Sequence, residues 1–131
     1  PVHGSEALDI AAEVMAEGWS VAIMPEGRVV PESEWEATGV GTARPGIGRL
    51  ALATGRPVVA VGVSGTDRFW PRGSNLPRIR PWRRFPLAVR YEVLGVMEGD
   101  QPSVTLDEIM AGITRCLNAT GSSTGRPAPT D

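Results

Sequence analysis

The sequence contains no lysine, one cysteine and one histidine, and each scarcity excludes a class of site. The single cysteine, Cys116, cannot form an internal disulfide or a metal site built from several thiolates. It lies in an apolar helical pattern, which favours a buried and inert thiol. The lone histidine, His3, excludes a metal site made of several imidazoles. All 13 cations are arginine, and together with abundant Gly, Pro, Ala and Val this indicates GC-rich coding before it indicates a function.

Long apolar runs and a strong net charge are also absent. No stretch approaches the roughly 18 apolar residues that a membrane-spanning helix needs. The formal net charge is −2 and 41% of the residues are hydrophobic, which favours neither disorder nor nucleic-acid binding. At 131 residues the chain is long enough for one domain or part of one.

Alternating helical and strand-like patterns predict an α/β fold. Apolar residues three and four apart predict helices, and short apolar runs predict strands. The expected helices cover residues 6–17 and 46–54, and a last helix follows a cap at Ser103 or Thr105 and ends near Asn118. The expected strands cover residues 19–24, 57–63 and 87–94. Because the first two strands are apolar on both faces, we expect a mostly parallel sheet with helices on both faces. Strands 19–24 and 57–63 should lie parallel, joined right-handed through helix 46–54.

The expected domain covers residues 1–118. From residue 119 to residue 131 the composition is dominated by Gly, Ser, Thr, Pro and Asp. Such a segment cannot bury enough apolar surface to order itself, so it predicts a disordered tail.

The most informative local pattern is the tetrapeptide from Pro25 to Arg28, which ends the first expected strand. It supplies a carboxylate, a glycine that permits close backbone approach, and a fixed cation. Open α/β sheets bind ligands at such strand ends, and the arginine fork suits a phosphate because it can bond two oxygens at once. Without further context, the same tetrapeptide is also compatible with an ordinary surface turn.

The context of this tetrapeptide resembles a known family. In order, the chain contains IMPEGR, a polar loop, ARPGIGRLALATGRPVVAVGVSGT and FWPRG. This series is similar to the second half of a glycerolipid acyltransferase domain of the lysophosphatidate type, over about residues 5–94. The chain departs from the family pattern in having no Thr between Gly27 and Arg28, no Ser after Arg28, and Ala60 in place of a second Pro.

The resemblance implies a function and a set of binding residues. The activity would be transfer of a fatty acyl group from acyl-CoA or acyl carrier protein to a lysophospholipid or glycerol-phosphate hydroxyl. No cofactor is expected, because the thioester is a co-substrate. The substrate-binding residues implied by the matching motifs are Pro25, Glu26, Gly27, Arg28, Arg44 and Pro57.

No catalytic residue is assigned to this chain. The family uses a His-x-x-x-x-Asp pair, in which the histidine takes the proton of the acceptor hydroxyl. That pair lies further upstream of Pro-Glu-Gly than this sequence extends, so the resemblance implies that the N-terminal portion of the domain is missing. His3 and Asp9 have the wrong spacing and lie too close to Pro25.

Arginines and aromatic residues alternate after the second expected strand. The arginines are Arg68, Arg72, Arg78, Arg80, Arg83, Arg84 and Arg90, and the aromatic residues are Phe69, Trp70, Trp82 and Phe85. This composition suits an anionic membrane surface or the phosphates of CoA, and it is equally compatible with a solvated loop. With the resemblance, it leads us to expect a cytoplasmic protein held peripherally at the inner membrane, with no nucleic-acid partner.

Two other functions remain open from the residues alone. The chain could be a non-catalytic module, derived from the same family, that binds a lipid phosphate or a membrane. It could also be an unrelated hydrolase-like α/β enzyme, although His3 is then the one histidine available as a base.

Overall fold

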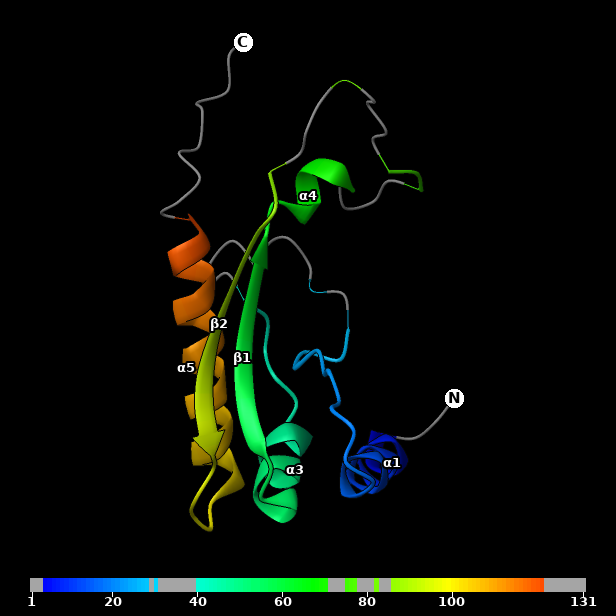
Figure 1. Cartoon of the computed structure of the whole chain (residues 1–131), viewed down its shortest axis with the longest axis vertical. Helices are drawn as coiled ribbons and strands as arrows, with labels where there is room; N and C mark the ends of the chain where they lie inside the picture. The colour runs from blue at the N-terminus through cyan, green and yellow to red at the C-terminus, as the bar shows by residue number, and fades with distance from the viewer. Residues whose placement is uncertain are drawn as a thin grey trace.

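The computed structural model describes residues 4–28, 30, 40–70, 75–77, 82 and 86–121. In chain order the elements are α1 (Gly4–Ala16), α3 (Gly46–Thr54), β1 (Pro57–Ser64), α4 (Thr66–Phe69), β2 (Ala88–Val96) and α5 (Pro102–Gly121) (Figure 1). The three predicted helices and two of the three predicted strands therefore form close to their expected bounds. Helix α5 continues past Asn118 to Gly121, and the rest of the expected tail lies outside the described residues.

The sheet differs from the prediction. Strands β1 and β2 pair antiparallel, from Pro57 opposite Val96 to Ser64 opposite Ala88, and they form the only sheet in the described part of the chain. The expected mostly parallel sheet with helices on both faces is therefore wrong. The prediction assumes that a strand with apolar residues on both faces is covered on both faces. One face of β1 is instead exposed to solvent. An apolar run shows that a strand gains from burial, and it does not show which layer covers it.

Residues 19–24 do not form the expected strand, so the predicted parallel pair of 19–24 with 57–63 is wrong as well. The Trp19 N–H still bonds back to Val14 O at the end of α1, and the Gly27 N–H bonds to Met24 O in the next turn. Between these two bonds the segment has no ladder partner among the described residues. The side chains of Trp19 and Met24 are 69% and 80% exposed, so the apolar character of the segment is not used for burial here.

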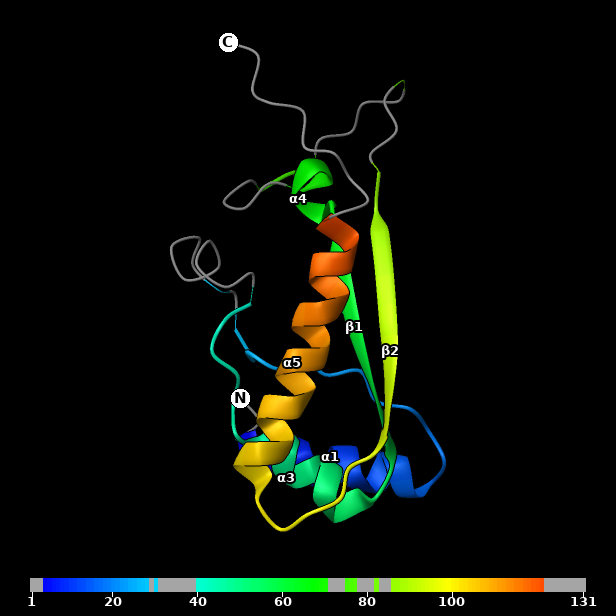
Figure 2. The same ribbon diagram turned by 90° about the vertical axis from the view of Figure 1, so that its left-hand side faces the viewer.

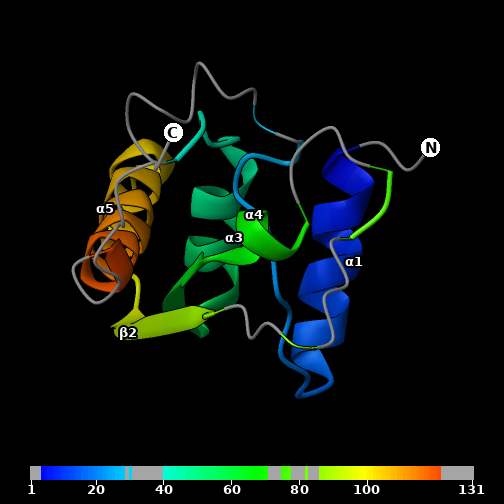
Figure 3. The same ribbon diagram turned by 90° about the horizontal axis from the view of Figure 1, so that it is seen from above.

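Helix α5 covers one face of the sheet, and small residues let it come close. An added Cβ on Gly62 would lie 2.7 Å from the backbone nitrogen of Leu117, and one on Gly112 would lie 3.1 Å from the Cβ of Ala60. The buried thiol of Cys116 donates to Ala60 O at 3.7 Å, which confirms the expected buried cysteine. Figure 2 shows α5 on one side of the two strands, and Figure 3 shows α3 on that same side.

The core lies where α3, α5 and the sheet meet. Its buried centre is Ala51, Met97 and Ile109, and partly buried aliphatic side chains surround it. Helix α1 packs against α3, where the end of the Leu8 side chain lies so close to Gly46 that it would have to shift if this position carried a Cβ. This contact holds α1 beside the start of α3, where the candidate site lies. No helix in the described ranges is long and apolar enough to cross a membrane.

Candidate functional site

The turn after residues 19–24 and the residue before α3 are brought together by backbone and side-chain hydrogen bonds. The Arg44 N–H donates to Pro25 O at 2.9 Å, and Arg44 Nε donates to Glu26 O at 3.4 Å. Gly27 has a φ of 62°, and a Cβ there would lie 2.8 Å from Arg44 Nε. The absence of a side chain at Gly27 therefore lets the arginine lie across the turn.

The carboxylate of Glu26 serves the scaffold of this turn. Its Oε1 accepts a hydrogen bond from the backbone N–H of Gly41 at 3.2 Å. Gly41 is buried, and a Cβ added there would come within 3.0 Å of the Glu26 side chain. A buried backbone donor costs free energy when it lacks an acceptor, so Glu26 stabilises the approach of the chain to Arg44. In this arrangement Glu26 positions the site from outside its cavity.

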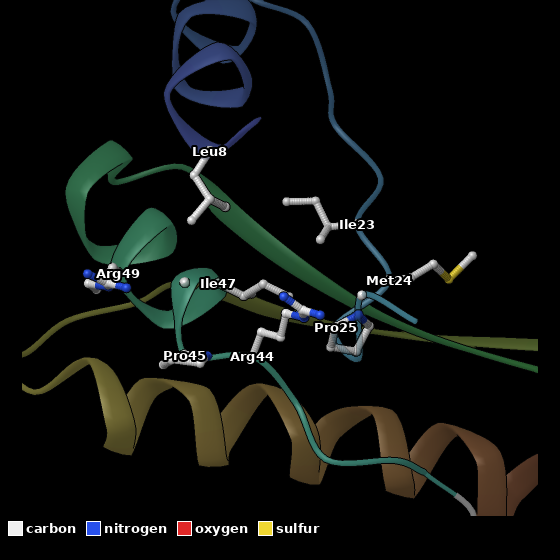
Figure 4. A pocket seen from close by; sticks show the side chains of 10 residues that line it. Leu8, Ile23, Met24, Pro25, Arg44, Pro45, Ile47 and Arg49 are labelled. Carbon is white, nitrogen blue, oxygen red and sulfur yellow. The ribbon is translucent and has the colours of Figure 1, made fainter. Parts of the chain in front are cut away.

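A cavity of about 290 Å³ opens beside this turn (Figure 4). Helix α1, the segment before the turn, the turn itself and the start of α3 all contribute to its wall. It is lined by Leu8, Ile23, Met24, Pro25, Gly27, Arg44, Pro45, Gly46, Ile47 and Arg49. Most of this lining is aliphatic, and its charged members are both arginines.

The electrostatics of the cavity favour an anion. Arg44 and Arg49 are exposed, and neither forms an ion pair with another described residue. The two terminal nitrogens of Arg44 likewise donate to no described residue, so they remain available to a ligand in this part of the chain. Helix α3 begins at the cavity, has no side-chain cap at Pro45 and has no acidic residue in its first turn. Its uncapped N–H groups add partial positive charge to that of the two arginines.

The structure brings some of the predicted binding residues together and leaves others apart. Pro25, Gly27 and Arg44 line the cavity, while Glu26 acts on it through Gly41. Arg28 is exposed and does not line the cavity. Pro57 begins β1 and is also outside the lining. A substrate-binding role for each of these residues stays a prediction.

Seven of the ten lining residues were not predicted as site residues from the sequence: Leu8, Ile23, Met24, Pro45, Gly46, Ile47 and Arg49. Leu8 and Ile47 belong to apolar helical stripes, which by themselves indicate core packing. Ile23 belonged to a segment expected to be a strand. Arg49 carries a signal in the sequence, since it lies in the first turns of helix 46–54, five residues after Arg44, and no acidic residue separates the two arginines.

No catalytic centre is recognised in the described ranges. His3 lies outside them, and Asp9 is an exposed residue of α1. No group of three or more His, Cys, Asp or Glu residues that could hold a metal ion occurs within the ranges that the structure describes.

Comparison with known proteins finds no match for the chain: no family model, no curated protein and no solved structure is similar to it. The resemblance to glycerolipid acyltransferases therefore rests on the quoted residues and motifs alone.

Proposed function

We propose that the chain is the acceptor-binding part of a glycerolipid acyltransferase, and that its cavity holds a lysophospholipid or glycerol phosphate. One observation carries this proposal. The Pro25–Gly27 turn and Arg44, which are distant in sequence, meet at a cavity lined by aliphatic side chains and two cations. Pro25, Gly27 and Arg44 are three of the six substrate-binding residues that the motif resemblance implies, although Arg28 of its phosphate motif lies outside the lining.

The lining of the cavity supports an amphiphilic anion as its ligand. A phosphate can receive two parallel hydrogen bonds from the guanidinium of Arg44 and further stabilisation from the N-terminus of α3. Leu8, Ile23 and Ile47 offer an apolar surface to the adjoining hydrocarbon. The volume of about 290 Å³ is near the lower end of ligand pockets, so it suits a headgroup and the first part of one acyl chain.

In the proposed reaction, the free hydroxyl of the bound acceptor attacks the thioester carbonyl of acyl-CoA or acyl carrier protein. A C–O bond forms, the C–S bond breaks, and the hydroxyl proton passes to a general base. The described residues contribute by binding and orienting the acceptor, and no base is assigned among them. The proposal includes peripheral association with an anionic membrane at the cytoplasmic side, because the acylated product is a lipid whichever acceptor is used.

Ligand binding to the purified chain tests the proposal. A short-chain 1-acylglycerol 3-phosphate, used below its micelle concentration, should bind more tightly than the matched neutral monoacylglycerol in isothermal titration calorimetry. Charge-assisted hydrogen bonds contribute roughly 1.5–3 kcal/mol, so Arg44→Ala should weaken binding of the phosphorylated ligand by about 10- to 150-fold. Arg44→Lys should recover only part of this loss, because a point charge replaces the fork.

Arg56→Ala is the matched control, since Arg56 is an exposed arginine just after α3 that does not line the cavity. Arg28→Ala separates the two candidate phosphate partners, because the motif resemblance favours Arg28 and the cavity favours Arg44. If Arg28→Ala abolishes binding while Arg44→Ala leaves it unchanged, the phosphate site belongs to Arg28. Equal affinity for the phosphorylated and neutral ligands would contradict the proposal itself.

A second candidate is a non-catalytic module that binds a lipid phosphate. It is favoured by the composition of the cavity, whose ten lining residues include no imidazole, carboxylate or thiol that could act as a base or nucleophile. Both candidates predict the same ligand binding and differ only in whether turnover accompanies it.

A further inference from the structure

The face of the sheet opposite α5 is apolar and exposed. Three cross-strand pairs form its centre: Val59 with Val93, Val61 with Tyr91, and Val63 with Val89. These six side chains are between 45% and 73% exposed, and Leu87 and Val96 extend the same row at 58% and 50%. Figure 1 views the sheet from this side, with β2 crossing in front of α5. We call these eight residues the outer face.

The outer face carries no charged residue, because both charged residues of the two strands lie on the face that α5 covers. Their two charged residues are Arg90 and Glu92. Glu92 pairs with Arg115 of α5, and Arg90 lies opposite Gly62, whose own face contacts α5. In an antiparallel sheet with one face in water, each strand usually alternates between apolar residues on the buried face and polar residues on the solvent face. Here both charged positions belong to the covered side, and the outer face carries only aliphatic side chains and Tyr91.

The area of the outer face matches what a protein interface requires. At their exposed fractions, the eight residues present on the order of 700 Å² of surface, against roughly 800 Å² per partner in a standard interface. The largest apolar patch on an ordinary monomer is about 300–600 Å². In the described part of the chain the helices lie on the other side of the sheet or beside it (Figure 2).

We propose that the outer face is the contact surface for a second copy of this chain, in a two-fold dimer with sheet packed on sheet. An uncharged face finds its complement in another uncharged face, whereas an anionic membrane or a charged partner would require cations that this face lacks. A two-fold contact is self-complementary, and two such sheets pack about 10 Å apart with their strands inclined by about 30°. The central Val61–Tyr91 pairs then lie nearest the two-fold axis. This inference does not depend on what the cavity binds.

Sedimentation equilibrium of the full chain in reducing buffer tests the dimer. We expect a concentration-dependent dimer that Val61→Arg and Val93→Arg each weaken by at least tenfold in dissociation constant. Val104→Arg is the matched control, because Val104 is 59% exposed but lies on α5. It should leave the dimer unchanged. Far-UV circular dichroism checks that each variant keeps its helical content.

A cysteine cross-link locates the contact independently of these substitutions. The buried Cys116 should stay unreacted, while Tyr91→Cys should form a disulfide-linked dimer on mild oxidation and Val104→Cys should not. A chain that is monomeric at every concentration would overturn the proposal, as would a dimer that neither outer-face arginine disturbs. A monomer that binds neutral phosphatidylcholine vesicles, and loses this on Val61→Arg, would assign the outer face to lipid and overturn the proposal equally.

Discussion

At the scale of single residues, the candidate site depends on a glycine that is needed for two separate reasons. Gly27 adopts a φ of 62°, which side chains rarely tolerate, and a Cβ there would also meet Arg44 Nε at 2.8 Å. Gly55, at the end of α3, adopts a similar φ of 57° but has open space around it. Comparing alanine substitutions at Gly27 and Gly55 therefore separates the effect of backbone strain from the effect of displacing the Arg44 side chain.

We expect Gly27→Ala and Gly55→Ala to destabilise the fold by similar amounts, about 1–2 kcal/mol each, because both force a left-handed conformation on a residue with a Cβ. Only Gly27→Ala should weaken binding of the phosphorylated ligand, by about tenfold, because its methyl group displaces the Arg44 side chain. Urea unfolding and calorimetric titration measure the two effects. An equal loss of binding in both variants would show that Arg44 does not depend on the space at Gly27.

Residue-level prediction from the sequence brought only part of the motif set to the cavity. Of the six motif residues, Pro25, Gly27 and Arg44 line the cavity, and the other three do not. A role in substrate binding stays a prediction for all six. Leu8 and Ile47 carry only helical periodicity, which cannot distinguish a residue facing a cavity from one facing the core. Whether Arg28 binds the phosphate stays a prediction for the variants above.

At the scale of the elements, β1 has two faces with opposite roles. Gly62 faces α5, and an added Cβ would lie 2.7 Å from Leu117 N, a backbone atom that cannot move without shifting the helix. We expect Gly62→Ala to lower the free energy of unfolding by about 1–3 kcal/mol through overpacking. Val63→Ala, on the adjacent exposed position, should cost less than about 0.5 kcal/mol in dilute monomer. Urea denaturation compares them, and equal costs would mean that α5 does not pack closely at Gly62.

The ion pair between β2 and α5 gives the fold a small dependence on pH. Arg115 Nη2 lies 2.8 Å from Glu92 Oε1, and the hydrogen bond from Arg115 lowers the pKa of the Glu92 carboxyl below its ordinary value. The stabilisation by this ion pair is therefore complete above the pKa that Glu92 has in the unfolded chain. It is lost as the pH falls through the lower pKa that Glu92 has in the folded chain. Both side chains are substantially exposed, at 55% and 38%, so solvent screening keeps the effect small.

We expect Glu92→Gln to lower the Tm by no more than a few degrees at neutral pH, with the difference disappearing as acid protonates Glu92. Differential scanning calorimetry across the acidic range measures the difference. Arg115→Gln added to Glu92→Gln should cause little further loss, since the pair is already broken. A difference in Tm that persists at the lowest pH at which the chain stays folded would show that Glu92 stabilises the fold by packing.

The elements differed in how well the sequence predicted them. Helix 46–54 was predicted well, because its apolar stripe and the closing Gly55 are local signals. The last helix was also predicted, but it begins at Pro102, ahead of the caps expected at Ser103 or Thr105. The direction of β2 relative to β1 was not predicted well, because it depends on which strands meet in space. Residues 19–24 have the composition of a strand, but a strand also requires a ladder partner, and this segment pairs with no strand in the described chain.

At the scale of the whole molecule, the described residues form a cavity suited to an acceptor, but no general base is assigned among them. The cavity offers cations and an apolar wall, while acyl transfer also needs a base that takes the proton of the acceptor hydroxyl. His3 is the only histidine, and its spacing from Asp9 and its position close to Pro25 do not match the motif of the family that the chain resembles. We therefore expect this chain, tested alone, to bind the phosphorylated acceptor without consuming a thioester.

The measurement is release of CoA thiol from a long-chain acyl-CoA, with and without a lysophosphatidate acceptor, followed beside the calorimetric binding of that acceptor. Release should stay at the rate of uncatalysed hydrolysis even when the acceptor saturates the cavity, because binding without a base holds the reactants but leaves the hydroxyl a weak nucleophile. His3→Ala should then change nothing, and Arg44→Ala should reduce binding alone. Acceptor-dependent thiol release that His3→Ala removes would instead make His3 the general base and this chain a complete catalyst.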